Sequence, residues 1–380
     1  MNIGIDARLL ERRITGIGRS LMIMLDEIPK YDKNNKYFLF TYQKIPHNKF
    51  YTNINTVRCV IPQKIFSPIW STYILPFYLK KNKIDVLFSI NQIVPLIKLK
   101  DCKYISVVND VIYKEDRAYL PFIYRTYLQI LARYSIKKSD TIITISQYSK
   151  NDIIKHYHLK ADRIKVVYPA ANAEFNSIPI SEQEKKEIKS LLNLPPYVVL
   201  YVGVIENRKN ILGILKVADE IFNKKDDIGF LLIGKLGHGS GKIVPAIQKR
   251  KNVVLHSNID DKMLKKLYNI ADVFLFPSLY EGFGYPPLEA MQCGLPVISS
   301  DNTSLREIIA DGGILRNPHD YKTMADDILK LLAEKDLYAE MRTRGLEQSK
   351  KFTIEKYVIE IIGVFNSFNV SEGTRGRRKK

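Results

Sequence analysis

Glu281 and Glu289 lie eight positions apart. The stretch between them has the residue types in this chain that are best suited to binding a ligand or to catalysis. Two glycines and two prolines lie between them, an apolar run precedes them and a helical pattern follows. The pattern predicts a strand, a glycine-rich loop and a helix start, with proline in the first helical turn. Glycines let a backbone approach a ligand, helix amino ends attract anions, and carboxylates accept hydrogen bonds from paired hydroxyls. A nucleotide sugar would fit these features, and an ordinary loop with two surface acids is the alternative.

Positive charge for such a ligand follows another apolar run, at residues 198–202. Arg208 and Lys209 fall in the predicted strand-to-helix loop after that run. Because the carboxyl ends of parallel strands meet at one edge of a sheet, we expect this pair near Glu281. Arginine offers a bidentate fork and lysine a point charge, so the pair could neutralise a diphosphate. A solvated charge pair in a surface loop is the alternative.

Three loops in the first half of the chain also follow apolar runs. Gly16 and Gly18 would let backbone amides reach a phosphate, or would form a plain turn. Asp110 could contact an acceptor hydroxyl, or cap a helix or turn. Ser146 is a candidate donor contact, and with Ser149 it also has the pattern of a helix N-cap.

Residues that commonly ligate metals are scattered along the chain. His156 and His158 do not share one helix face, so they predict no metal centre. The cysteines are Cys59, Cys102 and Cys293. Their odd number and wide spacing predict neither a disulfide framework nor a metal cluster and favour a reducing compartment. We expect no metal and no other cofactor.

Short apolar runs alternate with helical patterns, which predicts an α/β protein in which a doubly wound parallel sheet is built twice. The strand candidates lie at residues 3–5, 37–42, 57–61, 86–89, 104–108, 141–146 and 164–167, then at 198–202, 229–233, 253–256, 273–276 and 296–299. A polar segment at 177–189 separates the halves. We therefore expect domains at 1–177 and 190–352, a helix at 353–370 and a disordered basic tail at 371–380.

The net charge of +19 is uneven, because residues 1–180 hold 28 basic and 14 acidic side chains. This excess indicates an anionic partner, such as lipid headgroups, a polyanionic acceptor or nucleic acid, and solubility alone is the alternative. Stretches at 64–83 and 119–138 mix aromatic with basic residues, which suits an anionic membrane surface or a core-facing helix with a basic outer face. We expect no secretory signal, no transmembrane helix and no nucleic-acid partner.

Taken together, these residues resemble glycosyltransferase family 4, whose members are retaining enzymes with the GT-B fold. The likeness extends from Met1 to about Phe368, in runs that keep the family's order. The runs are IGIDARLL followed by TGIGRS, YVGVIENRKN, IADVFLFPSLYEGFGYPPLEAMQCGLPVISSD and LREIIADGGIL. The resemblance implies two Rossmann-like domains that face a central cleft, the first for the acceptor and the second for the nucleotide sugar.

The resemblance also implies roles for the matching positions. Arg208 and Lys209 would bind the donor diphosphate and stabilise the leaving group. Glu281 would contact hydroxyls of the transferred sugar. Gly16 and Gly18 would approach the diphosphate from the other domain.

Further contacts are implied for the loop between the two glutamates. The amides of Phe283 and Gly284 would help to hold sugar and phosphate, and Glu289 would accept hydrogen bonds from the ribose hydroxyls. Such enzymes generally need no metal, because arginine, lysine and helix termini stabilise the charge. In many relatives the final helix crosses back onto the first domain, and the predicted helix at 353–370 is placed to do so.

One position departs from the family's pattern. Relatives often carry a His-Asp pair where this chain has Asn109 and Asp110. Asparagine takes up no proton near neutral pH, so a histidine base is excluded and Asp110 is left to position the acceptor. A front-face mechanism, in which the leaving phosphate receives the acceptor's proton, needs no protein base. A covalent route through Glu281 is the alternative.

The resemblance therefore implies a hexosyltransferase that moves a sugar from a nucleotide sugar to a polyprenyl-diphosphate-linked or other membrane-bound glycan, in the assembly of O-antigen, capsule or exopolysaccharide. GDP-mannose is the first donor to test, and UDP- or dTDP-sugars are the alternatives. A nucleotide-sugar epimerase on the same fold, which would not need the basic first half, is a further alternative. We expect a cytoplasmic protein that binds peripherally to the inner face of the plasma membrane.

Overall fold

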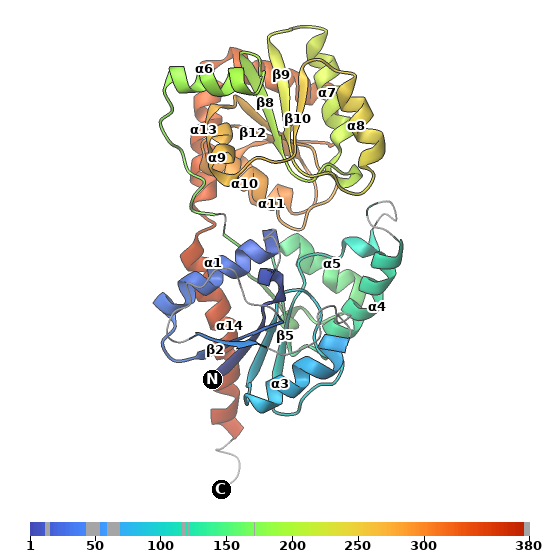
Figure 1. Ribbon diagram of the computed structural model, residues 1–380, viewed down its shortest axis with the longest axis vertical. Helices are drawn as coiled ribbons and strands as arrows, with labels where there is room; N and C mark the ends of the chain where they lie inside the picture. The colour runs from blue at the N-terminus through green and yellow to red at the C-terminus, as the bar shows by residue number, and fades with distance from the viewer. Residues whose placement is uncertain are drawn as a thin grey trace. The chain divides into compact units, whose positions relative to one another are not determined.

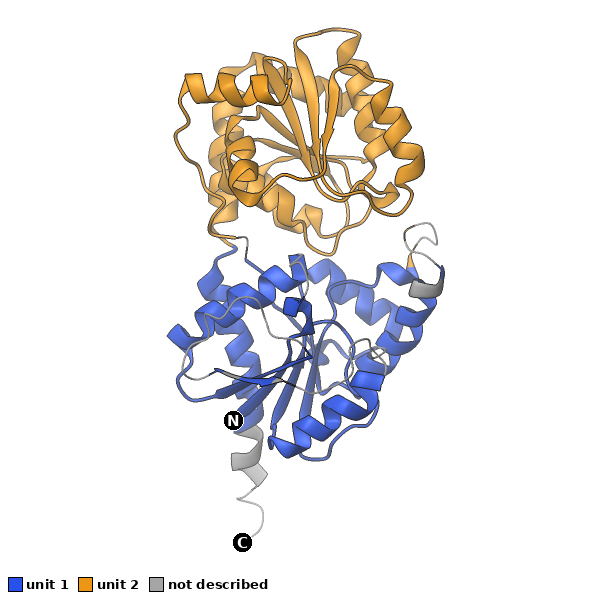
Figure 2. Cartoon of the chain, in the orientation of Figure 1, with its two compact units in different colours: residues 1–114, 122–170, 352–380 blue, residues 115–121, 171–351 orange. Residues whose placement is uncertain are grey.

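The computed structural model describes residues 1–11, 16–42, 54–58, 69–115, 119, 122–170 and 172–375. These residues form two compact units, which Figure 2 colours separately. Unit 1 comprises residues 1–114, 122–170 and 352–380, and unit 2 comprises residues 115–121 and 171–351. Some predictions fall partly outside the described residues, at 15 in the first glycine loop, 59–61 in a strand, 64–68 and 120–121 in the aromatic and basic stretches, and 376–380 in the tail.

Unit 1 is built on a parallel sheet of seven strands in the order β3-β2-β1-β4-β5-β6-β7 (Figure 1). The strands are β1 (Asn2–Asp6), β2 (Lys36–Thr41), β3 (Ile54–Arg58), β4 (Val86–Ser89), β5 (Lys103–Val107), β6 (Thr141–Thr144) and β7 (Ile164–Val166). Each strand predicted in the first half is present, and β3 begins before its predicted start. The strand order reverses between β1 and β4, which in doubly wound sheets marks the edge where ligands bind.

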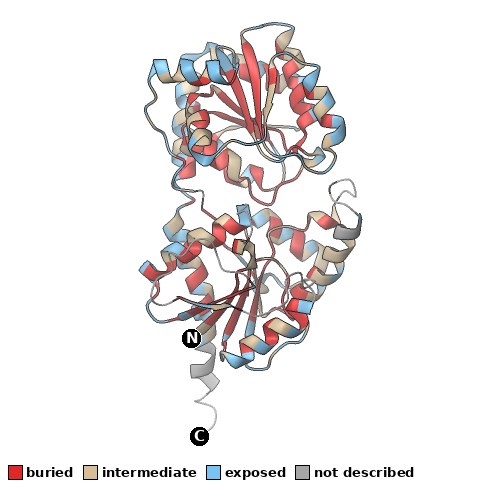
Figure 3. Cartoon of the chain, viewed as in Figure 1, coloured by how far each residue is buried: buried red, intermediate tan, exposed pale blue. Residues whose placement is uncertain are grey.

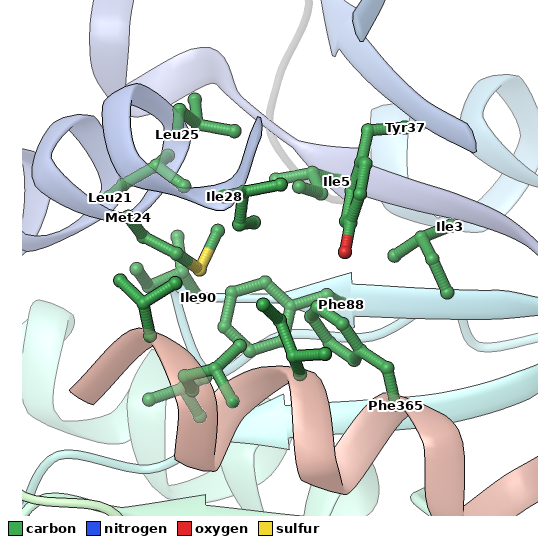
Figure 4. Packing of buried hydrophobic residues seen from close by; sticks show 14 of the residues in the cluster. Ile3, Ile5, Leu21, Met24, Leu25, Ile28, Tyr37, Phe88, Ile90 and Phe365 are labelled. Carbon is green, nitrogen blue, oxygen red and sulfur yellow. The ribbon is translucent and has the colours of Figure 1, made fainter. Parts of the chain in front are cut away.

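Helices cover both faces of this sheet. They are η1 (Arg8–Glu11), α1 (Gly16–Tyr31), η2 (Trp70–Ile74), α3 (Leu75–Lys81), η3 (Ile112–Lys114), α4 (Phe122–Lys138), α5 (Gln147–Tyr157), η4 (Ala161–Arg163) and α14 (Ile354–Arg375). α1 and α14 pack on one face, where their apolar side chains join those of the central strands in one cluster (Figure 4). η2 and α3 pack on the other face against Phe40, Leu87 and Tyr104.

The last helix, α14, belongs to unit 1 although the chain reaches it through unit 2. Its buried residues Tyr357, Ile361 and Phe365 recur every fourth position, which places them on one side of the helix. The rings of Phe365 and Phe88 meet edge to face with centroids 5.4 Å apart (Figure 4). α14 extends to Arg375, so residues 371–375 of the predicted disordered tail are helical.

Unit 2 is built on a parallel sheet of six strands in the order β10-β9-β8-β11-β12-β13. The strands are β8 (Tyr197–Val202), β9 (Ile228–Ile233), β10 (Val253–His256), β11 (Val273–Phe276), β12 (Val297–Ser300) and β13 (Ile314–Arg316). The edge strand β13 is absent from the predicted strands, because its three half-buried residues follow two glycines and form no apolar run. The strand order reverses between β8 and β11.

The helices of unit 2 are α6 (Glu182–Leu191), η5 (Asn207–Lys209), α7 (Ile211–Phe222), α8 (Ser240–Gln248), α9 (Asp261–Ile270), α10 (Tyr285–Gln292), α11 (Leu305–Ile309), η6 (Ala310–Gly312), α12 (Tyr321–Ala333) and α13 (Lys335–Ser349). α6 begins within the predicted polar separator, where the Ser181 hydroxyl accepts from the amide of Glu184. Figure 3 shows that the strands of both units are buried and that exposed residues gather on the outer sides of helices. Among the described residues, no helix combines the length and the apolar character that a membrane crossing requires.

Candidate active site

The two strands that flank the reversal of order in unit 2 lead into the loops that carry the predicted donor residues. β8 is followed by η5, which contains Arg208 and Lys209, and β11 is followed by the loop that contains Glu281. Since β8 and β11 pair in parallel, both loops leave the same edge of the sheet. The predicted proximity of Arg208 and Lys209 to Glu281 is confirmed by direct side-chain contacts.

Glu281 is buried and bound by two cations. Its Oε1 atom accepts from Lys209 Nζ at 2.5 Å and from the Ser278 hydroxyl at 2.6 Å. Its Oε2 atom accepts from Arg208 Nη1 at 3.1 Å. Burial alone would raise the pKa of Glu281, but the charges of Lys209 and Arg208 hold this pKa below its ordinary value. Glu281 is therefore an ionised hydrogen-bond acceptor at neutral pH.

Lys209 is as buried as its partner, with 7% of its surface exposed. Burial lowers the pKa of Lys209, an effect that the charge of Glu281 opposes and that of Arg208 reinforces. Its ammonium group also lies 5.0 Å from the ring centroid of Phe276, within range of a cation–π contact. The buried Lys209 ammonium group is thus held between the Glu281 carboxylate and the Phe276 ring.

Arg208 is held by a second carboxylate. Its Nε and Nη2 atoms donate to one oxygen, Oε1 of Glu206, at 3.1 and 2.6 Å. Its Nη1 atom donates to the carbonyl of Tyr280 at 2.8 Å as well as to Glu281. The four charged residues Glu206, Arg208, Lys209 and Glu281, which we name the four-charge cluster, therefore carry no net charge at the edge of the sheet.

Buried polar side chains fix the backbone beneath the cluster. Asn210 adopts a left-handed conformation with φ 55°, and its amide group donates to the carbonyl of Pro277 at 3.1 Å. This bond joins the loop after β8 to the loop after β11. The Ser304 hydroxyl lies 2.9 Å from the carbonyls of both Glu281 and Phe283. These contacts hold the loop of Glu281 in one place.

Gly284 and Glu289 also lie where the motif predicts a loop and a helix. Gly284 precedes α10 with φ 119°, and a side chain there would meet Leu305 as well as strain the backbone. Proline occupies the first turn of α10, as predicted. Glu289 lies on the buried side of α10 with 6% of its surface exposed, and its Oε2 atom accepts from the Tyr268 hydroxyl of α9 at 3.0 Å. Glu281 and Glu289 are therefore held by different partners.

The other four predicted site residues belong to unit 1 and follow strands of its own sheet. Gly16 begins α1, and Gly18 is buried in its first turn. Asp110 follows β5 and accepts through Oδ1 from a backbone amide two residues later at 3.2 Å, so the turn-capping alternative is confirmed. Ser146 is buried and accepts from the amide of Ser149 at 3.0 Å, so its N-cap alternative is confirmed as well. Contacts of these residues with donor or acceptor stay predictions.

Five residues that support the site are absent from the predicted site residues, and they are Glu206, Asn210, Tyr268, Ser278 and Ser304. Glu206 precedes Arg208 by two positions and Ser278 precedes Glu281 by three, so closeness in sequence could have indicated both. The other three reach partners 21 to 108 positions away. Only the folded arrangement of strands reveals those.

Each half of the chain matches a different family model. Residues 17–175 match the family described as Glycosyltransferase Family 4, and residues 182–348 match the family described as Glycosyl transferases group 1. O-antigen chain mannosyltransferase B from Escherichia coli is 33% identical over 63% of this chain and 64% of its own length. The serotype-specific mannosyltransferase WbdA from Escherichia coli is 30% identical over 60% of this chain and 28% of its own length. The match spans less than two thirds of either relative.

A solved structure shares the arrangement of the chain more completely. HepE from Anabaena, in complex with UDP-glucose, has a TM-score of 0.72 and 15% identity, and the match covers 96% of this chain and 99% of that chain. At such identity the likeness concerns the fold. Together with the two doubly wound parallel sheets, it confirms the GT-B class that the sequence predicts.

Proposed function

Since the chain belongs to glycosyltransferase family 4, we propose that it moves a sugar, with retention of configuration, from a nucleotide sugar to a membrane-bound glycan in the assembly of a surface polysaccharide such as O-antigen. GDP-mannose is the proposed donor, because both relatives from Escherichia coli are described as mannosyltransferases. The UDP-glucose bound to HepE supports a UDP-sugar as the alternative. The proposed acceptor is an oligosaccharide linked to a lipid, such as a polyprenyl diphosphate.

The observation that carries this proposal is the ionised Glu281 between two cations at the reversal of strand order. Among the described residues its Oε2 atom accepts only from Arg208, which leaves a lone pair for a sugar hydroxyl. Arg208 and Lys209 would stabilise the negative charge that develops on the leaving diphosphate. Glu289 would accept from the ribose hydroxyls while Tyr268 holds its carboxylate. Phosphate, sugar and ribose would then each meet a suitable group.

The proposed mechanism is the front-face route. The bond between the anomeric carbon and the phosphate oxygen breaks as the acceptor oxygen bonds to the same face, and the acceptor's proton passes to the leaving phosphate. Glu281 is a poor nucleophile for the covalent alternative, because three donors already stabilise its negative charge. Asp110 would position the acceptor, since Asn109 cannot act as a base.

Donor binding is the first step to test, in full-length protein, by the rise in melting temperature with GDP-mannose, UDP-glucose and a dTDP-sugar. We expect GDP-mannose to stabilise the wild type. Transfer is then measured with a donor whose sugar is radiolabelled and with an acceptor from a membrane lipid extract. Glu281→Gln should abolish this transfer. Glu340→Gln is the matched control, because it removes a carboxylate from an exposed pair with Arg344, and it should retain transfer.

Two other outcomes discriminate between the alternatives, and a third result tests whether a metal is needed. If no nucleotide sugar or nucleoside diphosphate stabilises the wild type, the transferase proposal is wrong. Conversion of the donor to an epimer without any acceptor would favour the epimerase. We expect transfer to persist in a metal chelator, since Arg208 and Lys209 would supply the positive charge that the leaving group needs.

A further inference from the structure

One surface of unit 1 exposes large apolar side chains that its core does not use. They come from the helical segment of η2 and α3, from α4 and from the loop between β4 and β5. Between 46% and 72% of the surface of each is exposed, and they are Ile69, Tyr73, Phe77, Ile97, Phe122 and Ile130. The first three recur every fourth residue, so they form one stripe. Apolar side chains that gather in this way mark an interaction surface more often than single exposed ones do.

The loop between β4 and β5 joins the two helices into one surface. Leu99 of this loop packs against the cluster that contains Leu79 of α3. Lys98 Nζ donates to the carbonyl of Lys138, at the end of α4, at 3.1 Å. Ile97 of the same loop precedes both residues, and its side chain is exposed. We name the combined surface the α3–α4 face.

The α3–α4 face is strongly basic. Residues 69–103 and 122–140 hold ten Lys or Arg and three Asp or Glu, a net charge of +7. The exposed basic residues at the carboxyl ends of the two helices are Lys80, Lys81, Arg133, Lys137 and Lys138. The segments that carry the exposed apolar side chains therefore also carry exposed cations.

A pocket of about 390 Å³ lies at the carboxyl end of α3. Its apolar lining comes from Leu79, Ile84, Leu99 and Cys102, and its charged lining from Lys80, Lys83, Lys100, Asp85 and Asp101. A lining that combines apolar side chains with three lysines suits an anionic headgroup that is joined to an apolar chain. The pocket is therefore a concave site with the same combination of apolar and basic side chains as the rest of the α3–α4 face.

We propose that the α3–α4 face docks on a bilayer that contains anionic phospholipids. The aromatic and aliphatic side chains insert between headgroups, and the lysines and arginines meet the phosphates. A membrane fits better than a protein partner, because the cores of protein interfaces are depleted of lysine whereas here lysine borders the apolar stripe. This proposal adds a lipid surface to the partners of the protein. It rests on the proposed function in one respect, namely that the acceptor is bound to a membrane.

Sedimentation with vesicles of phosphatidylcholine, with or without phosphatidylglycerol, tests the docking surface in the full-length protein. We expect the wild type to bind the anionic vesicles, and less strongly as salt rises. The double variant Lys80→Glu, Lys81→Glu should bind at least about tenfold more weakly, since each basic residue near an anionic surface contributes about fivefold. Tyr73→Ser with Phe77→Ser should weaken binding by a similar factor, because two inserted rings are lost.

Unit 2 supplies the matched controls. Lys322→Glu with Lys335→Glu makes the same change of charge at exposed positions, and Leu191→Ser removes an apolar side chain that is 71% exposed. Both should bind vesicles as the wild type does. Equal binding of the α3 variants and the wild type, or a dimer that these variants dissociate, would overturn the membrane assignment. No nucleotide sugar takes part, so such a failure leaves the proposed transfer standing.

The four-charge cluster carries a second, independent inference. Nε of Arg208 has a single N–H, which donates to Glu206, and Nη2 donates to the same carboxylate. A diphosphate that binds the Nε and Nη2 edge of the guanidinium must therefore replace Glu206 there. Glu281 is held by two further donors and Tyr280 offers a backbone carbonyl. Among the described residues, the carboxylate of Glu206 is held by Arg208 alone. Glu206 is therefore the acceptor that can leave most readily.

We infer that Glu206 is an exchangeable counter-ion for Arg208. Before the donor binds, Glu206 positions the guanidinium and neutralises it. On binding, the diphosphate takes over Nε and Nη2, and the carboxylate turns to solvent. This inference rests on the proposed function, in which Arg208 binds the donor diphosphate.

The variant Glu206→Gln, titrated calorimetrically with GDP and UDP, tests the exchange. The dissociation constant of the nucleotide that binds should fall about fivefold, because the competing pair is of the partly exposed kind. Glu340→Gln should leave it unchanged, and the melting temperature without nucleotide reports folding of both variants. An unchanged or higher dissociation constant would show that Glu206 only orients Arg208. A wild type that binds neither nucleotide would overturn the proposed function together with this inference.

Discussion

Replacement of Gly234 by alanine should displace Arg208, although the new methyl group would contact a different residue. Gly234 follows β9 and lies beside the loop that leads from β8 to Arg208. A Cβ atom on Gly234 would lie 1.7 Å from the carbonyl oxygen of Gly203. Because the obstacle is backbone, no side-chain rotation relieves the clash, and the end of one strand must move.

Hydrogen bonds between the two loops set the size of the effect. The amide of Gly203 donates to the carbonyl of Ile233 at 2.8 Å. Ile205 donates to the carbonyl of Lys235 at 2.8 Å and accepts from the amide of Gly237 at 3.0 Å. A carbon–oxygen contact needs about 3.3 Å, so the Gly203 carbonyl must shift by more than about 1 Å. Such overpacking costs about 1–3 kcal/mol, and a catalytic group displaced by about 1 Å loses about 100-fold in rate.

The assay compares Gly234→Ala with Gly241→Ala in α8. Nothing lies within 4 Å of a Cβ atom on Gly241, and alanine is the better helix former. We expect Gly234→Ala to lower kcat/KM for transfer about 100-fold and Tm by about 2–10 °C, whereas Gly241→Ala should match or exceed the wild type in Tm. Wild-type activity in Gly234→Ala would refute the coupling of the two loops. Equal loss of Tm in both variants would refute the steric cause.

The remaining predictions concern single side chains. Lys209→Met should lower the free energy of unfolding by about 3 kcal/mol in chemical denaturation, because Glu281 stays buried with one cation fewer, and an unchanged midpoint would contradict this. Tyr268→Phe removes the donor to Glu289 and should weaken nucleoside diphosphate binding about fivefold by calorimetry, and unchanged affinity would separate Glu289 from the ribose. Burial would raise the pKa of Asp32, but hydrogen bonds from its neighbours hold it below its ordinary value. The stability that Asp32 contributes is therefore present above about pH 3.9 and is lost as pH falls through the lower pKa of the folded state. Tm of the wild type should then decline more steeply below about pH 4 than Tm of Asp32→Asn. Parallel curves of Tm against pH for the two proteins would contradict the assignment.

The architecture is predictable from the sequence because parallel strands that are buried on both faces appear as continuous apolar runs. β4, β10 and β11 coincide with their predicted ranges, and an aspartate or asparagine directly precedes each run. β13 carries no such signal, because its residues are half-buried and too few for a pattern. Its place at the edge depends on pairing with β12, which only the folded sheet supplies.

The charged residues of the site are predictable for a topological reason. Arg208 and Glu281 follow strands that are neighbours at the reversal of order, and any doubly wound sheet brings such loops to one edge. The groups that hold them are a different matter. Ser304 reaches the loop of Glu281 across 23 positions, and Asn210 reaches Pro277 across 67. These contacts depend on strand register and loop conformation, which periodicity of apolar residues does not specify.

Electrostatics explains why the cluster includes two carboxylates rather than one. Arg208 and Lys209 lie side by side and largely buried, so each would disfavour the charge of the other before a donor arrives. Glu281 offsets that repulsion permanently, because Ser278 and both cations hold it. Glu206 offsets the rest through Arg208 alone, so in the proposed exchange it would yield to a diphosphate while Glu281 would stay to meet the sugar. In the proposed exchange, unequal anchoring of two like charges would thus separate the residue that the donor displaces from the residue that the donor contacts.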